Sequence, residues 1–240
     1  MTVPGRVRLF CLPYAGASAA VFAQWRRGLP DAVDVRPVEL PGRGSRIGEA
    51  PCTDPRALTR RLADEVAGSV TGSYALFGHS LGALLAFELA HELRDRGIAA
   101  PRALFASGCA GPAVCDGAYF RRPRSDADLR DALSAYGATP PEALADPALM
   151  ALVLPVLRAD FRLRGAYTYA ARPALDCPIQ ALGGTRDDVA RADLEAWGRE
   201  TRGPFDLALF EGDHFFIHAR RGPVLDLVGR RIGARAEAAA

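Results

Sequence analysis

The sequence predicts an α/β protein whose mostly parallel sheet is covered by helices on both faces. Short apolar runs alternate along the chain with stretches of helical periodicity, as in parallel α/β domains. The chain has 240 residues, which is enough for one such domain and its core. Hydrophobic residues make up 49% and charged residues 24%, as in an ordinary soluble globular protein. We therefore expect a single domain over residues 1–240.

Six apolar runs predict the strands of a buried parallel sheet, namely Val7–Leu12, Val33–Val38, Tyr74–Phe77, Ala103–Ser107, Ile179–Leu182 and Leu207–Phe210. Five amphipathic stretches between them predict helices, namely Ala19–Gly28, Pro55–Ser69, Gly82–Arg96, Asp193–Thr201 and Pro223–Ile232. Gly97 is suited to end the third of these helices.

One connection is too long for this pattern. About seventy residues separate the strand ending at Ser107 from the strand starting at Ile179, more than a structureless loop usually has. Within them, helical patterns cover Asp126–Tyr136, Pro140–Ala145 and Pro147–Ala166. We expect residues 115–172 to form a helical lid over a site at the carboxyl edge of the sheet. The alternative is an insertion that only packs on the domain.

Composition excludes several classes of function. The net charge of +2, without a dense Lys/Arg run, does not favour nucleic-acid binding. A mean hydropathy of +0.01, no membrane-length apolar run and no signal-like segment in Met1–Arg8 argue against a membrane or secreted protein, so we expect a cytoplasmic one. Five cysteines without CxxC spacing are expected to be reduced, and no metal site or cofactor is expected.

The most informative motif is Gly78-His79-Ser80-Leu81-Gly82, which follows an apolar strand and opens an amphipathic helix. This is the context of a nucleophile elbow, in which a strained turn lifts the serine above the sheet edge and glycines avoid clashes. The helix N-terminus then favours the negative charge that develops in acyl transfer. The motif predicts the α/β-hydrolase fold with Ser80 as nucleophile.

A serine hydroxyl needs a base, and four histidines are candidates. His79 adjoins Ser80 and is expected to pack beneath the turn, and His91 lies in the middle of a helix. His214 follows the last strand in a glycine-containing loop, which is where this fold places its base, whereas His218 is four residues further on. We favour His214 as the catalytic base.

The histidine in turn needs a carboxylate that orients it and stabilises its cation. Asp187 and Asp188 follow the strand Ile179–Leu182, and either could serve. We choose Asp187, with loop or capping roles as the alternative for both. The order serine, aspartate, histidine is the one expected for this fold.

The oxyanion requires two backbone N–H donors. Leu81, directly after the nucleophile, is expected to supply one, and Ala15 in the loop after the first strand the other. A phosphate-binding loop is excluded at this position because no Gly-Lys-Ser/Thr follows Gly16.

Several stretches together resemble the type II thioesterases of polyketide and nonribosomal peptide synthases. They cover most of the chain and are LFCLPYAGASA, VELPGRGSR, FGHSLGALLAFELA, LPVLRADFRL, GGTRDD with LEAW, and FEGDHFFIH. The elbow is common to esterases of this fold, whereas PGRG and LRADF are more specific. The resemblance supports Ser80, Asp187 and His214 as a catalytic triad, with Leu81 and Ala15 as oxyanion donors. Two departures are Gly165, where the family usually has glutamate, and a loop one residue shorter after Asp187.

The resemblance implies an enzyme that removes misprimed or stalled acyl groups from the phosphopantetheine arms of carrier proteins. We expect it to be a monomer. Leu154, Leu157 and Phe161 of the lid would then border the acyl group, or simply pack the lid. Because such carriers are acidic, we expect a basic docking face; the candidate residues are Arg121, Arg122, Arg124, Arg158, Arg162 and Arg164. The alternative is a scattered, solvated set of arginines.

Three rival functions stay open at this point. A small-molecule esterase or lipase would use the same triad, and an acyltransferase would pass the acyl group to an alcohol or amine instead of water. A non-catalytic module that binds carrier proteins would bind without turnover.

Overall fold

The computed structural model describes residues 6–135 and 139–237, and its centre is a six-stranded parallel sheet. The strand order is β2-β1-β3-β4-β5-β6, with every pair parallel. The strands are β1 (Val7–Leu12), β2 (Val33–Pro37), β3 (Tyr74–His79), β4 (Leu104–Ser107), β5 (Ile179–Gly184) and β6 (Phe205–Phe210). The predicted parallel sheet is therefore confirmed, and β3 runs on to the residue before Ser80.

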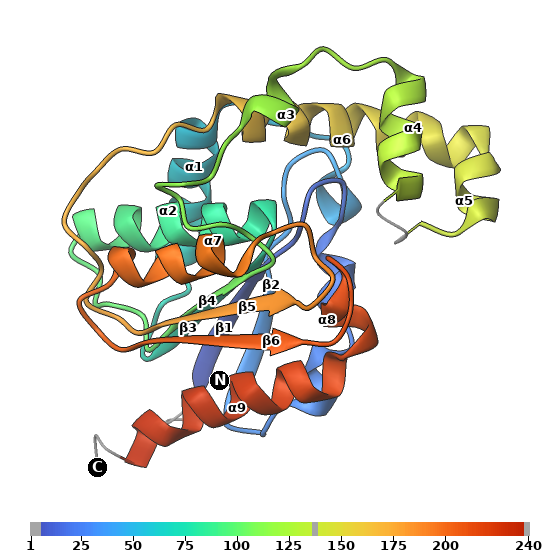
Figure 1. Ribbon diagram of the computed structural model, residues 1–240. Helices are drawn as coiled ribbons and strands as arrows, with labels where there is room; N and C mark the ends of the chain where they lie inside the picture. Colours follow the sequence, from blue (N-terminus) through green and yellow to red (C-terminus); the bar gives the residue numbers. More distant parts are fainter. Residues whose placement is uncertain (1–5, 136–138, 238–240) are drawn as a thin grey trace.

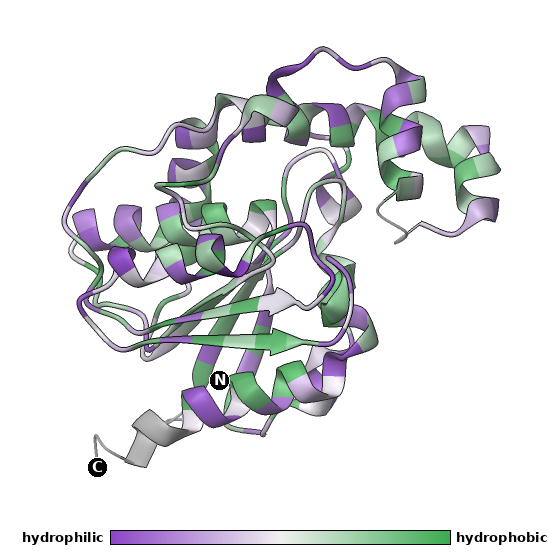
Figure 2. Cartoon of the chain, viewed as in Figure 1, coloured by the Kyte–Doolittle hydropathy of each residue, from purple (hydrophilic) through white to green (hydrophobic). Residues whose placement is uncertain are grey.

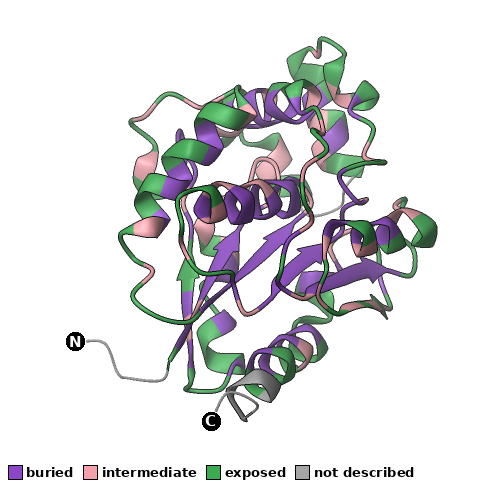
Figure 3. Ribbon diagram, turned by 90° about the vertical axis from the view of Figure 1, so that its left-hand side faces the viewer, coloured by how far each residue is buried: buried purple, intermediate pink, exposed green. Residues whose placement is uncertain are grey.

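Helices cover both faces of the sheet, as predicted (Figures 1 and 3). The long ones are α1 (Pro55–Ala67), α2 (Leu81–Asp95) and α9 (Arg221–Glu237). The predicted helix over Ala19–Gly28 is wrong in type, since this stretch forms two 3₁₀ turns, η1 (Ala19–Phe22) and η2 (Trp25–Gly28). The helix predicted at Asp193–Thr201 divides into α7 (Arg191–Glu195) and η4 (Ala196–Glu200), and α8 (Phe216–Ala219) precedes α9.

The two faces of the sheet carry separate hydrophobic clusters. Successive side chains of a strand point to opposite faces, so Leu76 of β3 packs with α1 and α2, whereas Phe77 packs with η1, η2 and α9. In Figure 2 the hydrophobic colour follows the strands and alternates with the hydrophilic colour along α9. Phe77 is fully buried against Phe22 and Trp25, with ring centroids 6.0 and 4.6 Å away. A packed hydrophobic layer thus covers each face of the sheet.

Helix boundaries follow from capping residues. The carboxylate of Asp54 accepts hydrogen bonds from the N–H groups of Arg56 and Ala57, and Pro55 begins α1. Gly97 follows α2 with φ +76°, a conformation that glycine adopts without strain. The start of α1 and the end of α2 are therefore set by the residues next to them in the chain.

The long connection between β4 and β5 forms four helices, α3 (Ala118–Arg121), α4 (Asp126–Ala135), α5 (Pro141–Ala145) and α6 (Pro147–Ala166). Figure 1 shows α3 and α6 above α2, with α4 and α5 to the right, beyond the carboxyl ends of the strands. α3 was not predicted, and Tyr136, the predicted end of α4, lies outside the described residues. A third hydrophobic cluster joins α4 to α6 and is separate from the two clusters on the sheet. The inserted segment thus has a core of its own.

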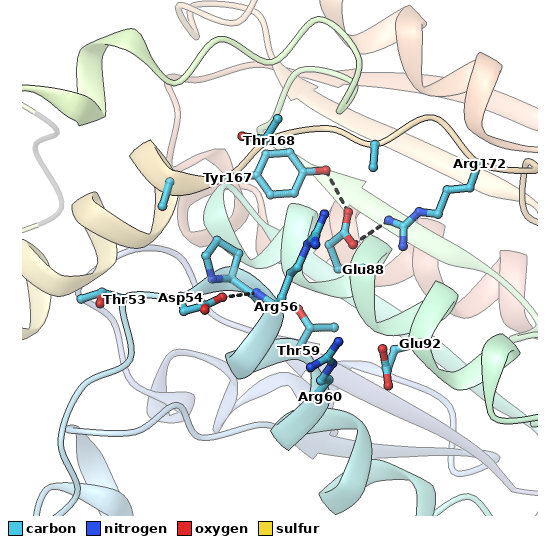
Figure 4. Close-up of a pocket in the computed structure, with 13 residues that line it drawn as sticks. Thr53, Asp54, Arg56, Thr59, Arg60, Glu88, Glu92, Tyr167, Thr168 and Arg172 are labelled. Carbon is cyan, nitrogen blue, oxygen red and sulfur yellow. Dashed lines mark hydrogen bonds and ion pairs between the residues drawn. The ribbon is translucent and has the colours of Figure 1, made fainter.

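The return from α6 to the sheet is held to α2 by the half-buried carboxylate of Glu88. Tyr167 donates its hydroxyl hydrogen bond to Oε1 of Glu88 at 2.9 Å, and Nη2 of Arg172 lies 2.6 Å from Oε2 (Figure 4). These residues line a cavity of about 590 Å³ between α1, α2 and residues 166–172. None of Ser80, Asp187 and His214 lines it. Within the described residues, no helix is both long and apolar enough to cross a membrane.

His91 of α2 makes stability depend on pH. Its ring is 1% exposed and packs edge-on against Phe87 at 4.5 Å, and within the described chain neither ring nitrogen has a hydrogen-bond partner. Burial, reinforced by the positive charges of Arg172 and Arg94, lowers the pKa of His91 to about 3. In the unfolded chain the pKa is about 6.5. The unfolded state therefore binds one more proton between these values.

We predict that the contribution of neutral His91 to the free energy of unfolding is complete above pH 6.5 and is lost as the pH falls from 6.5 toward 3. The loss amounts to about 1.4 kcal/mol per pH unit for one proton. Urea unfolding at a series of pH values measures it. His91→Leu should have a shallower acid slope than wild type, while His79, whose pKa burial also lowers, keeps its own contribution. Equal slopes for the two proteins would contradict the prediction.

Candidate active site

The candidate site lies where the strand order of the sheet reverses. After β1 the chain adds β2 on one side, and from β3 onward it adds strands on the other side. In open parallel sheets this reversal leaves a crevice at the carboxyl ends of the two strands, where ligands bind. At this reversal the loop after β1, which contains Ala15, and the turn after β3, which contains Ser80, leave the sheet from adjacent strands. The two predicted halves of the site therefore lie on adjacent strands.

Ser80 occupies a strained turn. Its φ of 54° and ψ of −116° make it the one non-glycine residue in the described part of the chain with positive φ. The turn is held by a 2.7 Å hydrogen bond from its N–H to the carbonyl of Ser107, and α2 begins at the next residue. Such strain persists only where the surroundings enforce it, and it is common at catalytic residues. The geometry is that of a nucleophile elbow.

The two glycines of the motif are required by close backbone contacts. A Cβ atom at Gly78 would lie 2.0 Å from the carbonyl oxygen of Gly82. A Cβ at Gly82 would lie 2.2 Å from the carbonyl oxygen of Leu12, at the end of β1. The N-terminus of α2 therefore packs directly on both strands. Any larger residue at either position would push the helix, and Ser80 with it, away from the loop after β1.

His214 and Asp187 form a pair at the carboxyl ends of β5 and β6. Nδ1 of His214 lies 3.0 Å from Oδ2 and 3.1 Å from Oδ1 of Asp187. The Asp187 side chain is 2% exposed and that of His214 is 19% exposed. One carboxylate oxygen also accepts a hydrogen bond from the N–H of Val189 at 3.3 Å. A buried carboxylate on Nδ1 favours the tautomer that leaves Nε2 able to accept a proton.

Backbone hydrogen bonds join the loops that carry this pair. The N–H of Thr185 donates to the carbonyl of Phe210, and that of Arg186 to the carbonyl of Gly212, both at 2.8 Å. A Cβ at Gly184 would lie 2.4 Å from the carbonyl oxygen of Asp213, so only glycine fits there. The β5–β6 ladder therefore continues into the loops and sets the distance between aspartate and histidine.

The other candidates for the triad make different contacts. Asp188 is exposed, and the carboxylate that lies against Nδ1 of His214 is that of Asp187. His79 is fully buried beneath the turn, with Nδ1 2.9 Å from the Ser107 hydroxyl and its ring 5.0 Å from that of His214. His218 lies 3.1 Å from the hydroxyl of Tyr14. Burial lowers the pKa values of both His79 and His218, which keeps their rings neutral at pH 7.

The two candidate oxyanion donors, Leu81 and Ala15, come from different elements. Leu81 is the first residue of α2, where the N–H has no partner within the helix. Ala15 lies in the loop after β1 and is half buried against the main core and the cluster of the inserted segment. The loop is also held by Tyr14, whose ring contacts Phe215 next to His214 at a centroid distance of 4.9 Å. The structure thus brings this loop and the histidine loop together.

Leu154, Leu157 and Phe161 lie in the core of the inserted segment. Each is at most 3% exposed, and they pack with Leu129 and Met150. Leu157 also contacts the loop after β1, since its Cδ1 would lie 3.1 Å from a Cβ at position 16. The packing role is therefore present in the structure, and contact with a substrate stays a prediction.

Five of the six predicted arginines converge on one cavity of about 400 Å³ between α3 and α6; they are Arg121, Arg122, Arg124, Arg158 and Arg162. Phe161 forms part of its wall. Arg121 pairs with Asp116, and Arg158 with Asp126. The guanidinium of Arg124 stacks on Tyr119 at 4.0 Å.

The prediction for Arg164 is wrong. This residue is 7% exposed, and its Nη2 lies 2.6 Å from Sγ of Cys115 and 3.3 Å from the carbonyl oxygen of Asp116. Its guanidinium also lies 5.1 Å from the ring centroid of Phe120. Arg164 therefore fastens α6 to α3 inside the segment and offers no charge to a partner.

A comparison with known families identifies the chain. Residues 7–232 match the family model described as Thioesterase domain. The chain belongs to the thioesterase family. It is 34% identical to the gramicidin S biosynthesis protein GrsT of Aneurinibacillus migulanus over 95% of this chain and 89% of the relative. This thioesterase is therefore a relative of biosynthetic proteins of similar length.

Solved structures of thioesterases are also similar to this chain. RedJ, the thioesterase from the prodiginine biosynthetic pathway in Streptomyces coelicolor, is 36% identical with a TM-score of 0.87, covering 96% of each chain. The type II thioesterase BorB from the borrelidin biosynthetic cluster is 35% identical with a TM-score of 0.87, covering 96% of this chain and 94% of BorB. These likenesses confirm the α/β-hydrolase fold and the resemblance to type II thioesterases of polyketide and nonribosomal peptide pathways.

Sequence reasoning missed two residues at the site, Arg43 and Asp160. Both were noticed only as parts of the motifs PGRG and LRADF, without a role. They form a buried ion pair that touches the loop after β1. The available signal was an acidic residue between Ala159 and Phe161 on an apolar helical face, because a buried carboxylate requires a partner.

The pairing of Asp187 with His214 gives a matched test, since Asp188 is its exposed neighbour. We predict that Asp187→Asn lowers kcat for thioester hydrolysis by about 10⁴-fold, because the amide favours the wrong histidine tautomer. Asp188→Asn should stay within about twofold of wild type. Steady-state kinetics of both variants decide between the two acids. A large loss in Asp188→Asn with an active Asp187→Asn would reverse the assignment.

Proposed function

We propose that this thioesterase hydrolyses acyl groups from the phosphopantetheine arms of carrier proteins, and so removes aberrant or stalled acyl groups from a polyketide or nonribosomal peptide synthase. The observation that carries the proposal is the strained Ser80 at the start of α2, together with the pairing of His214 with the buried carboxylate of Asp187 on the neighbouring loops. Family membership and the type II relatives support the substrate class.

In the proposed mechanism Ser80 is the nucleophile and His214 the base. As Oγ of Ser80 bonds to the thioester carbonyl carbon, its proton passes to Nε2 of His214, and the buried carboxylate of Asp187 stabilises the imidazolium. The carbonyl oxygen becomes an oxyanion, which the N–H groups of Leu81 and Ala15 stabilise in this mechanism. The dipole of α2, a helix of 15 residues, favours the same negative charge.

Collapse of this intermediate breaks the carbon–sulfur bond and leaves an acyl-serine. A thiol has a pKa of about 8.5, so the leaving sulfur needs less protonation than an amine, and His214 returns the proton to it. A water molecule then attacks the acyl carbon while His214 takes its proton, and the free acid and Ser80 are released. Hydrolysis therefore depends on the oxyanion donors and on water reaching the acyl-serine.

The inserted segment is proposed to act as a lid over the acyl group. Leu157 of α6 lies on the loop that carries Ala15, so the apolar side of α6 is close to the proposed reaction centre. Leu154 and Phe161 lie in the same cluster. Apolar side chains next to the acyl-serine would exclude bulk water and favour an apolar acyl chain.

The arginine-lined cavity is proposed as the docking site for the acidic carrier protein. In the described chain, Arg122 and Arg162 are exposed and no carboxylate lies within 4.0 Å of them, whereas Arg121 and Arg158 already have acidic partners. Positive charges at the rim of an interface steer an acidic partner and raise the association rate. The cavity lies against α6, the helix that also contacts the loop after β1.

The substrate class is tested by presenting one acyl group in three ways, on a carrier-protein pantetheine arm, on coenzyme A and as a nitrophenyl ester. We expect the highest kcat/KM for the carrier-bound thioester, and loss of all three activities in Ser80→Ala, because each requires the same nucleophile. Mass spectrometry should detect acyl-Ser80 in wild type.

Each alternative result has a defined meaning. Preference for the nitrophenyl ester would replace the proposal by a small-molecule esterase. An acylated enzyme that turns over only with an added alcohol or amine would make it an acyltransferase. Carrier binding without turnover would make it a binding module.

Docking is tested by reversing the two unpaired charges. We predict that Arg122→Glu/Arg162→Glu lowers kcat/KM for the carrier-bound substrate roughly tenfold and flattens its dependence on salt, because attraction to the acidic carrier is lost. Turnover of the nitrophenyl ester should not change. Arg27→Glu is the matched control, because Arg27 is an exposed arginine of η2 on the opposite face of the sheet. Unchanged carrier kinetics and salt dependence in the double variant would remove this cavity as the docking site.

A further inference from the structure

A buried ion pair connects α6 to the loop that carries the proposed oxyanion donor. Arg43 and Asp160 are 6% and 2% exposed. Nη1 of Arg43 donates to Oδ2 of Asp160 at 2.6 Å and Nη2 donates to Oδ1 at 2.7 Å, so the pair is bidentate. The residues are 117 positions apart in the chain. Neither is part of the proposed triad.

The PGRG motif is what turns Arg43 inward. Gly42 and Gly44 have φ of +84° and +50°, while Arg43 between them is extended, with φ −146° and ψ 165°. A Cβ at Gly42 would lie 2.5 Å from Pro51, and a Cβ at Gly44 would lie 1.9 Å from the carboxylate of Glu39. Two glycines are needed for this tight double turn. The motif therefore delivers one guanidinium to a fixed position in the interior.

Both members of the pair also hold the loop after β1. Oδ2 of Asp160 accepts a hydrogen bond from the N–H of Gly16 at 2.7 Å. Nη1 of Arg43 donates to the carbonyl of Ala17 at 3.2 Å. Within the loop, the N–H of Ala17 donates to the carbonyl of Tyr14 at 3.1 Å. The peptide groups on the C-terminal side of Ala15 are thus fixed by α6 and by the PGRG segment.

We propose that Arg43 and Asp160 are positioning residues that aim the N–H of Ala15 at the oxyanion, and thereby make hydrolysis depend on the seating of α6. The inference rests on the proposed function of Ser80 and Ala15. Arg43 and Asp160 act through the loop after β1. Gly16 donates its N–H to Asp160 and is contacted by Leu157 of the same helix. A displacement of α6 releases Gly16 and turns the adjacent peptide of Ala15 away.

The physics of buried ion pairs supports a positioning role. Burying two charges costs desolvation that their attraction repays only partly, so such a pair adds little net stability compared with apolar residues of similar volume. What it supplies is geometry, because a bidentate contact has one favourable arrangement. Removing one partner leaves a buried, unpaired charge, whereas removing both does not. This difference allows stability and catalysis to be separated by experiment.

The test compares wild type with Asp160→Asn, Arg43→Lys and the charge-free double variant Arg43→Met/Asp160→Leu. Arg164→Gln is the matched control, because Arg164 is an equally buried arginine of α6 that contacts Cys115 and not the loop after β1. Two quantities are measured for each protein, kcat and KM on a nitrophenyl ester, and the Kd of an arylboronic acid. The boronic acid bonds to Ser80 and places an oxygen in the oxyanion site, as the tetrahedral intermediate does.

We expect Asp160→Asn and the double variant to lower kcat about 10- to 100-fold with KM within about twofold of wild type, a loss somewhat below that of deleting an oxyanion donor. The Kd of the boronic acid should rise by the same factor. Arg43→Lys should lie between these variants and wild type, and Arg164→Gln should keep both values. Thermal melting should recover in the double variant while kcat does not.

Wild-type kcat and boronate affinity in folded Asp160→Asn would overturn the proposal. So would recovery of kcat together with stability in the double variant, since that is the behaviour of a purely structural pair. Where Asp160→Asn does not fold, the double variant decides alone. Because the readouts use a simple ester, failure of carrier-bound turnover in wild type would refute the proposed function and leave this test intact.

Discussion

The close approach of α2 to the ends of β1 and β3 is the constraint on which the site depends. The helix can reach the carbonyl of Leu12 only because Gly82 has no side chain, and the elbow can close only because Gly78 has none. The same contact leaves Ser80 in a strained conformation that the hydrogen bond to Ser107 maintains. The proposed nucleophile, the N-terminus of α2 and the loop that carries Ala15 are thus all positioned by the same backbone packing.

Around this fixed centre the remaining groups are held by loops, each fastened to a neighbour. The Asp187 loop continues the β5–β6 ladder to reach His214, and Tyr14 packs its ring against Phe215 from the other side. The loop after β1 is fastened in turn by Asp160 of α6. Catalysis by such a site would require its groups to be held to well within 1 Å, and the contacts between these loops supply that support.

The sequence contained enough local information to predict most of the fold and of the candidate site. The strands, the elbow at Ser80 and the loop positions of Asp187 and His214 follow from periodicity and from glycine placement, because each depends on neighbours in the chain. The 3₁₀ turns at Ala19–Phe22 and Trp25–Gly28 were missed, since burial of Phe22 and Trp25 against the sheet outweighs helical propensity there. Contacts between distant segments were beyond such reasoning.

Arg43 and Asp160 illustrate that limit and also what the structure adds to the two motifs. PGRG and LRADF are each unremarkable as local patterns, and only the fold brings the guanidinium of one to the carboxylate of the other. The pair joins α6 to the loop after β1, while Leu163 and Tyr167 at the end of α6 pack into the main core and Tyr167 also donates to Glu88. A buried ion pair is specific in geometry but weak in net energy, so the pair determines where α6 meets the loop after β1 more than how tightly it is held there. The proposed positioning role of Arg43 and Asp160 therefore makes the alignment of the proposed oxyanion donor depend on two segments that lie 117 positions apart in the chain.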